Sequence, residues 1–121
     1  MLTFQGETRV VLYSAQFAES RRFYEQILKL KIISEWDHGG GQLGVIYALG
    51  NTYLEVLQGS RDAHADDFYL YSRVENVQEL WNGLRDKVEV IDTLQTQPWG
   101  HTNFSIKDPN GYKLKFFSKA V

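Results

Sequence analysis

The chain has 121 residues, a length that suits one ordinary globular domain. Hydrophobic residues make up 43% and charged residues 23% of the sequence, which is the balance of a folded protein and excludes a disordered chain. The formal net charge of -2 provides no basic footprint for DNA or RNA, and the absence of cysteine excludes disulfides, thiolate metal sites and cysteine nucleophiles. No apolar run is long enough to span a membrane, and residues 1–7 lack a signal-like pattern. We therefore expect a cytoplasmic protein with no nucleic-acid or membrane partner.

The first half of the chain predicts one strand, one helix and three more strands. Alternating β-branched and aromatic residues predict a strand over 9–14, and an apolar stripe at three- and four-residue steps predicts a helix over about 17–29. Strand-like runs follow over 31–36, 43–49 and 53–58, separated by glycine-containing turns.

The same order of elements returns in the second half. A strand is predicted over 68–74, and Asn76 is a good helix N-cap because Glu79 follows three residues later, as in a capping box. An amphipathic helix starts at Val77. Three further strands are predicted over 88–94, 102–107 and 112–118.

The two halves align at a constant spacing. Arg9 matches Tyr69 and Leu54 matches Leu114, each 60 positions on. Internal self-similarity of this kind is a clue to the fold. We predict one α+β domain over 1–121 made of two βαβββ modules in pseudo-twofold repeat, at about 7–59 and 67–119. A ferredoxin-like β-α-β-β-α-β domain is the alternative, but it needs fewer strands than the pattern predicts.

The two faces of the predicted central strands differ in character, because side chains alternate along a strand. One face is apolar and suits a core covered by helices. The other mixes aromatic and ionisable side chains at Arg9, Tyr13, Tyr53, Glu55, Tyr69, Tyr71, Arg73, Lys113, Lys115 and Phe117. Such a mixture is typical of a concave small-molecule site, and the alternative is a sheet face that solvent simply wets.

Two stretches of the sequence resemble a known superfamily. Residues 9–16, with Phe23-Tyr24 and Ile27-Leu28 after them, resemble the first module of the vicinal-oxygen-chelate superfamily, which includes glyoxalases, bleomycin resistance proteins and extradiol dioxygenases. The closing signature of that superfamily is similar to Pro98-Trp99-Gly100-His101, Asp108-Pro109-Asn110-Gly111 and Phe116-Phe117. The resemblance covers nearly the whole chain. It implies curled mixed sheets around a cleft, helices on the outside, and a homodimer.

The resemblance also implies where relatives hold a metal, and these positions correspond here to Arg9, Glu55, Tyr69 and Lys115. Only Glu55 is an ordinary ligand for a divalent ion, because arginine and lysine offer no lone pair at neutral pH. We therefore expect no metal and no cofactor. We expect Glu55 to form an ion-pair cluster with Arg9 and Lys115 instead.

The three histidines do not restore a metal site in the sequence. His38, His64 and His101 all fall in predicted loops, without a ligand spacing between any two of them. His101 follows Pro-Trp-Gly, a position that often faces the cleft in relatives. It is either a hydrogen-bonding or proton-transfer group there or a simple turn residue.

The sequence as a whole favours a metal-independent protein that binds a small molecule, an antibiotic or a metabolite, by capture without turnover. No residue is assigned a catalytic role, and the lysines and arginines on the predicted site face favour an anionic or neutral ligand. Ligand contacts are predicted at Arg9, Tyr13, Trp36, Tyr47, Tyr53, Glu55, Tyr69, Tyr71, Trp99, His101, Phe104 and Lys115.

Two alternatives remain open from the sequence. One is a metal-dependent lyase, isomerase or dioxygenase of the same superfamily with a rebuilt metal site, in which Glu55 is a ligand or a general base. The other is a regulatory module whose cleft holds a peptide or a metabolite.

Overall fold

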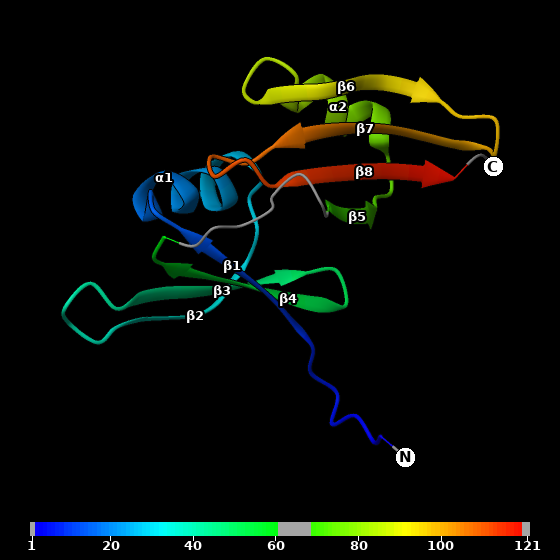
Figure 1. Cartoon of the computed structure of the whole chain (residues 1–121). Helices are drawn as coiled ribbons and strands as arrows, with labels where there is room; N and C mark the ends of the chain where they lie inside the picture. The colour runs from blue at the N-terminus through cyan, green and yellow to red at the C-terminus, as the bar shows by residue number, and fades with distance from the viewer. Residues whose placement is uncertain (1, 61–68, 120–121) are drawn as a thin grey trace. The chain divides into compact units, whose positions relative to one another are not determined.

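The computed structural model describes residues 2–60 and 69–119. The chain forms two compact units, Met1–Asp62 and Ala63–Val121, called unit 1 and unit 2 below, and each is described by itself (Figure 1). Among the described residues, no helix is long and apolar enough to cross a lipid bilayer.

Unit 1 contains one mixed four-stranded sheet and one helical segment. The strand order is β1-β4-β3-β2, with β1 parallel to β4 and the remaining pairs antiparallel. In chain order the elements are β1 (Arg9–Ser14), α1 (Phe17–Arg21), the π-helix η1 (Arg22–Ile27), β2 (Ile32–Asp37), β3 (Leu43–Leu49) and β4 (Thr52–Gln58).

The helix of unit 1 is less regular than the sequence predicts. It starts at Phe17 as expected, but its second part is a π-helix, in which the Leu28 amide donates to the carbonyl of Phe23, five residues back, at 2.9 Å. Lys29 then adopts a positive φ of 59°, a left-handed conformation that stops the helix. The predicted helix is therefore present, but it is not a continuous α-helix over 17–29.

Unit 2 repeats the architecture of unit 1. Its sheet has the order β5-β8-β7-β6, again with one parallel pair, β5 with β8. Figure 1 shows α2 on one side of this sheet, where it contacts β7 and β8. The elements are β5 (Tyr69–Arg73), α2 (Val77–Leu84), β6 (Glu89–Thr96), β7 (His101–Lys107) and β8 (Lys113–Lys119).

The repeat predicted from the sequence is confirmed, and so is the α+β class with two βαβββ modules. In unit 1 Arg9 pairs with Tyr53, and in unit 2 Tyr69 pairs with Lys113, so both partners are displaced by the same 60 positions. One local prediction is confirmed as well. The Asn76 side chain accepts a hydrogen bond from the Glu79 amide at 3.1 Å, as an N-cap does.

Each unit has an apolar core on the helix side of its sheet. In unit 1 the rings of Tyr24 and Tyr47 lie 5.7 Å apart and are both fully buried. In unit 2 Trp81 of α2 packs on Phe104, which in turn packs on Phe116. Burial of each such side chain contributes about 1.5–3 kcal/mol, so these faces stabilise the units and are closed to a ligand.

Candidate ligand-binding site

The strand register of unit 2 decides which side chains share the sheet face opposite α2. Partners across a ladder point to the same side, and residues two apart on one strand do so too. Tyr71 pairs with Lys115, and Phe117 pairs with both Arg73 and Asn103. The face opposite the helix therefore carries aromatic, basic and amide side chains together. We call the rings of Tyr69, Tyr71, Trp99, His101 and Phe117 the aromatic face of unit 2.

Three rings form the centre of the aromatic face. Phe117 stacks on Tyr71 with 4.5 Å between ring centroids and an interplanar angle of 18°, and on His101 with 4.4 Å and 14°. The Tyr71 hydroxyl and His101 Nδ1 form a hydrogen bond of 2.9 Å. Each ring is therefore held by at least two contacts, which limits its rotation and presents a preformed stacking surface.

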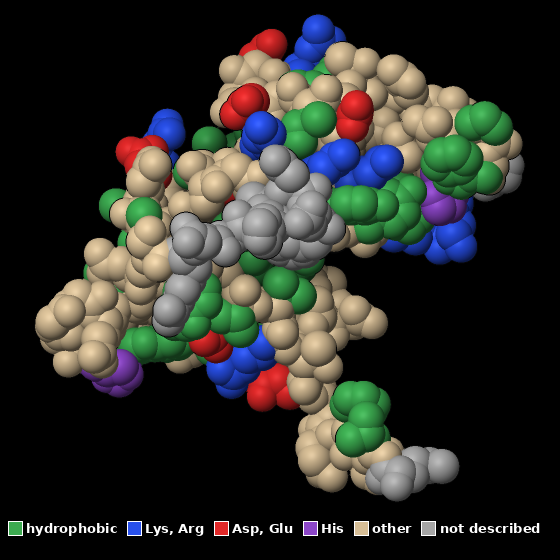
Figure 2. All heavy atoms as spheres, viewed as in Figure 1, with side chains coloured by type: hydrophobic (Ala, Val, Ile, Leu, Met, Phe, Trp, Pro, Cys, Tyr) green, Lys and Arg blue, Asp and Glu red, His purple; other side chains and the backbone are tan. Residues whose placement is uncertain are grey.

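Two more rings border this centre and are open to solvent. Tyr69 meets Tyr71 edge-on at 6.1 Å and is 51% exposed. Trp99 lies 6.5 Å from His101 and is 63% exposed. Exposed aromatic rings in one patch are common at binding sites and uncommon on surfaces without a partner. Figure 2 shows hydrophobic and basic side chains gathered over β5 and the adjoining part of β8.

A tight turn positions the Trp99 end of the aromatic face. The Gly100 amide donates to the Gln97 carbonyl at 3.0 Å, and the Gln97 amide donates to the His101 carbonyl at 2.7 Å. Proline at the second position and Gly100, with a φ of 94°, suit this turn. His101 consequently starts β7 instead of lying in a loop, and this corrects the sequence prediction. The hairpin brings its ring back over β8, where it meets Phe117.

Two lysines of β8 add positive charge beside these rings. Lys115 Nζ lies 5.9 Å from the Tyr69 ring centroid and 5.6 Å from that of Tyr71, in the range of cation–π contacts. Lys113 Nζ lies 5.4 Å from Tyr69 and 3.7 Å from an Asp92 carboxylate oxygen. The hydrogen bond from the Ser105 hydroxyl, and then the two lysine charges, lower the pKa of Asp92.

Asn103 is a residue of this face that the sequence analysis missed. Its side chain is 2% exposed, and its Oδ1 accepts a hydrogen bond from Gln97 Nε2 at 3.2 Å. Its Nδ2 has no hydrogen-bond partner among the residues that the structure describes. The available signal was its position two residues after His101, which places both side chains on one face of β7.

In unit 1 the face opposite the helix carries a charge pair. Arg9 Nη1 donates to Glu55 Oε1 at 2.7 Å, and Arg9 also contacts Glu7 at 3.3 Å. The hydrogen bond with Glu55, more than the one with Glu7, raises the pKa of Arg9. The Arg9–Glu55 part of the expected cluster is thus present, whereas Lys115 belongs to unit 2 and makes the contacts described above.

Three further predicted site residues of unit 1, Tyr13, Trp36 and Tyr53, are partly buried on the same side. Tyr53 pairs with Arg9 in the ladder, and Tyr13 lies four residues after Arg9 on β1, so both share the face of the charge pair. Trp36 pairs with Gly44, and a Cβ at Gly44 would overlap the indole, so the ring lies flat across β3. The Trp36 ring also stacks on the His38 ring, with 6.3 Å between their centroids.

Tyr47 and Phe104 do not offer the stacking surfaces that the sequence analysis assigned to them. The register pairs Tyr47 with Leu54 and Phe104 with Phe116, so both rings belong to the helix side. Both are fully buried, and the Tyr47 hydroxyl donates to Glu25 at 2.6 Å. The hairpins set the register of β3 against β4 and of β7 against β8, and this register decides which face each side chain takes. Alternation within a single strand does not reveal it. We leave both residues out of the proposed ligand surface.

The residues at the superfamily's metal positions do not fit a metal ion. In unit 1 these positions hold Arg9 and Glu55. The Glu55 carboxylate, which would be the metal ligand, instead accepts a hydrogen bond from the Arg9 guanidinium. In unit 2 these positions hold Tyr69 and Lys115, and the Lys115 ammonium has no lone pair to donate to a metal. In the described ranges 2–60 and 69–119, no group of three or more His, Asp or Glu side chains could hold a metal. His64 lies outside these ranges.

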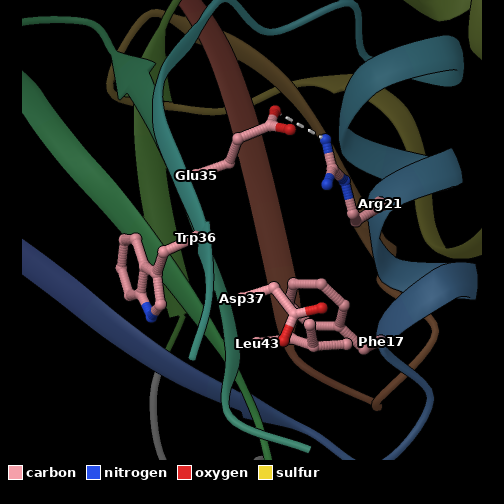
Figure 3. Close-up of a pocket in the computed structure, with 6 residues that line it drawn as sticks. All are labelled: Phe17, Arg21, Glu35, Trp36, Asp37 and Leu43. Carbon is pink, nitrogen blue, oxygen red and sulfur yellow. Dashed lines mark hydrogen bonds and ion pairs between the residues drawn. The ribbon is translucent and has the colours of Figure 1, made fainter. Parts of the chain in front are cut away.

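A separate cavity of about 480 Å³ lies on unit 1 and is lined by Phe17, Arg21, Glu35, Trp36, Asp37 and Leu43. Figure 3 shows an ion pair across it, in which Arg21 Nη2 lies 3.0 Å from Glu35 Oε2. In this view Trp36 leaves β2 on the side opposite Glu35 and Asp37. Arg21 also pairs with Glu25 at 2.6 Å, and the cavity contains none of the rings that make up the aromatic face.

Comparison with known proteins gives one family and many similar structures. The family model described as "Glyoxalase/Bleomycin resistance protein/Dioxygenase superfamily" matches residues 8–116. No curated protein gives a significant match to the sequence.

Three solved structures illustrate the structural similarity. YycE from Bacillus subtilis, described as a protein of unknown function and a putative glyoxalase/fosfomycin resistance protein, is 27% identical with a TM-score of 0.72, over 92% of this chain and 88% of that one. A putative glyoxalase family protein from Bacillus anthracis is 20% identical with a TM-score of 0.78, over 98% of both chains. TnmS3, an antibiotic binding protein from Streptomyces sp. CB03234, is 15% identical with a TM-score of 0.81, over 99% of this chain and 100% of that one.

Proposed function

The chain belongs to the glyoxalase/bleomycin resistance protein/dioxygenase superfamily, and from this premise we propose that it is a metal-independent protein that binds a small molecule on the aromatic face of unit 2. The observation that carries the proposal is the stack of Tyr71, Phe117 and His101, bordered by the exposed rings of Tyr69 and Trp99. A preformed aromatic surface binds planar molecules without the entropic cost of ordering loose side chains. TnmS3, whose fold is shared, is described as an antibiotic binding protein, and this supports an antibiotic or a metabolite as the ligand class.

The residues at the superfamily's metal-ligand positions favour ligand binding without turnover over a metal-dependent reaction. An arginine and a lysine stand at two of the superfamily's metal positions, and the only carboxylate there is paired with the arginine. The lyase, isomerase and dioxygenase alternatives all need a metal that these residues do not suit. We therefore derive no catalytic step.

Titration of a panel of planar aromatic compounds tests the proposal. Trp99 is exposed at the edge of the face, so bound rings are expected to quench its fluorescence, and calorimetry then measures the dissociation constant. Tyr71→Ala removes the stack on Phe117 and should weaken binding about tenfold or more, since aromatic contacts of this kind contribute about 0.5–1.5 kcal/mol beyond the area that they bury.

Phe4→Ala is the matched control, because Phe4 is 78% exposed and lies outside the aromatic face. Equal affinity of wild type, Y71A and F4A for every compound that binds would place the ligand elsewhere and refute this site.

Two expectations from the sequence accompany the proposal. We infer a homodimer, as the superfamily resemblance implies, and sedimentation equilibrium at micromolar concentration tests it by giving either twice the 14.0 kDa chain mass or that mass itself. We also infer a cytoplasmic location, and fractionation of the source cells would assign the protein to the soluble or the membrane fraction.

A further inference from the structure

A buried amide, that of Asn103, lies on the same sheet face as the rings of the aromatic face. Asn103 is 2% exposed, and Gln97 donates to its Oδ1 at 3.2 Å, which orients the amide. Its Nδ2 is left without a partner among the described residues. Buried donors are nearly always paired, because an unpaired one loses its hydrogen bonds to water without compensation. This donor therefore points to an acceptor that a bound molecule supplies.

Lys115 adds a positive charge to the same sheet face. Lys115 is two residues before Phe117 on β8, and Phe117 is the ladder partner of Asn103. Diagonal neighbours of this kind lie about 7–8 Å apart, within reach of a long side chain. Lys113 is 3.7 Å from an Asp92 carboxylate oxygen, whereas Lys115 makes cation–π contacts and acts on Asp92 without forming an ion pair with a described residue.

We infer that the ligand of the aromatic face is a planar aromatic molecule with an anionic oxygen group, of the aromatic carboxylate class. This inference rests on the proposed function and names its ligand class. The ring stacks on Tyr71 and Phe117. The oxygen group accepts a hydrogen bond from Asn103 Nδ2 and is paired with the Lys115 ammonium. The sheet face would thus recognise the ring by aromatic stacking, and the anionic group by a hydrogen bond from Asn103 and the charge of Lys115.

Three small probes separate the contributions of ring and charge on the wild-type protein. The probes are 2-naphthoate, 2-naphthylmethylamine and acetate, which carry ring and anion, ring and cation, and anion alone. We expect 2-naphthoate to bind at least about tenfold more tightly than either of the others, because only it satisfies both the buried donor and the stack. Its affinity should fall as salt is added, because the charge on Lys115 is partly open to screening.

Asn103→Asp is the sharpest variant. An aspartate still accepts the hydrogen bond from Gln97, but it presents a negatively charged oxygen where the free NH₂ stood. Binding of 2-naphthoate should drop at least about tenfold. Asn82→Asp is the matched control, since Asn82 Oδ1 also accepts from a glutamine, Gln78 Nε2 at 3.1 Å, but lies on the exposed surface of α2. Lys115→Gln provides a second variant if N103D does not fold, and it should weaken 2-naphthoate binding and flatten the salt dependence.

The outcomes distinguish this inference from the proposed function. Equal binding of both naphthyl probes, or unchanged 2-naphthoate affinity in N103D and K115Q, overturns the anionic ligand class and leaves the aromatic site standing. Failure of both naphthyl probes, together with the whole aromatic panel, overturns the proposed function and this inference with it. Preference for 2-naphthoate that N103D abolishes and N82D retains supports the inference.

Discussion

The hydrogen-bond cluster around Glu25 in unit 1 allows a prediction whose size and pH dependence both follow from the structure. The Glu25 carboxylate accepts from Arg21 Nε at 2.6 Å and from Arg21 Nη2 at 3.2 Å. It also accepts from the hydroxyl of the fully buried Tyr47 at 2.6 Å. Glu25→Gln removes the charge and keeps the size of the side chain, so it tests these contacts with little change in packing.

The pKa of Glu25 sets the pH range in which this cluster stabilises the fold. Partial burial by itself raises this pKa, but the hydrogen bonds from Arg21 and Tyr47 outweigh it and leave the pKa below its ordinary value of 4.5. A carboxylate with a lowered pKa in the folded state contributes stability above its unfolded pKa. That contribution is lost as the pH falls from about 4.5 through the folded pKa.

The expected cost at neutral pH is modest. The pair of Arg21 with Glu25 is partly exposed and four residues apart on a helix, so it is worth about 0.3–0.5 kcal/mol. The Tyr47 contact is a hydrogen bond to a charged group and contributes about 1.5–3 kcal/mol, of which the neutral amide recovers part. We therefore expect E25Q to lower the free energy of unfolding by about 1–2 kcal/mol at pH 7.

Urea denaturation measured at pH 7 and at about pH 3 checks both parts of this prediction. The deficit of E25Q against wild type should shrink at the lower pH, because below about pH 4.5 the unfolded wild type binds a proton at Glu25 more readily than the folded state does. Glu19→Gln is the control, since Glu19 is an exposed carboxylate on α1. A deficit of E25Q no larger than that of E19Q at pH 7, or one that is the same at both pH values, would refute the reasoning.

Three further predictions concern the N-cap of α2, the packing of Trp36 and the aromatic face of unit 2. Asn76→Ala should lower the free energy of unfolding by about 1 kcal/mol, measured by thermal melting, because it removes the N-cap of α2. Gly44→Ala should cost about 1–3 kcal/mol and change the tryptophan emission, because the new methyl group must displace the Trp36 indole; an unchanged spectrum would contradict the described packing. Tyr69→Ala should leave the far-UV circular dichroism unchanged, because the Tyr69 side chain is 51% exposed, and it should weaken ligand binding in a calorimetric titration.

Local features of the sequence were enough to predict the order of the strands and helices and its repetition in two modules. Alternation within strands, the cap at Asn76 and the repeat at 60 positions each depend on residues close together or on a pattern carried twice. The helix after Phe17 was predicted in place but not in form. The π-helix depends on hydrogen bonds five residues apart, which the apolar stripe does not distinguish from those four apart.

The site was only partly predictable. Alternation put Arg9 and Glu55 on the polar strand face, and the superfamily resemblance implied that both lie at one cleft; the structure joins them at 2.7 Å. The assignment of Tyr47 and Phe104 needed the phase of one strand against the next, and the hairpins that set this phase are a tertiary feature.

What the sequence determined by itself was therefore which residues form strands and helices and which side chains alternate within each strand, because these depend on local chemistry. Tertiary structure alone decided which strands lie side by side and in which register. That register stacks His101 on Phe117 although 16 positions separate them in the chain, and it leaves the buried Asn103 Nδ2 without a hydrogen-bond partner among the described residues. Burial of a polar atom depends on everything packed around it, and only the folded chain specifies those neighbours.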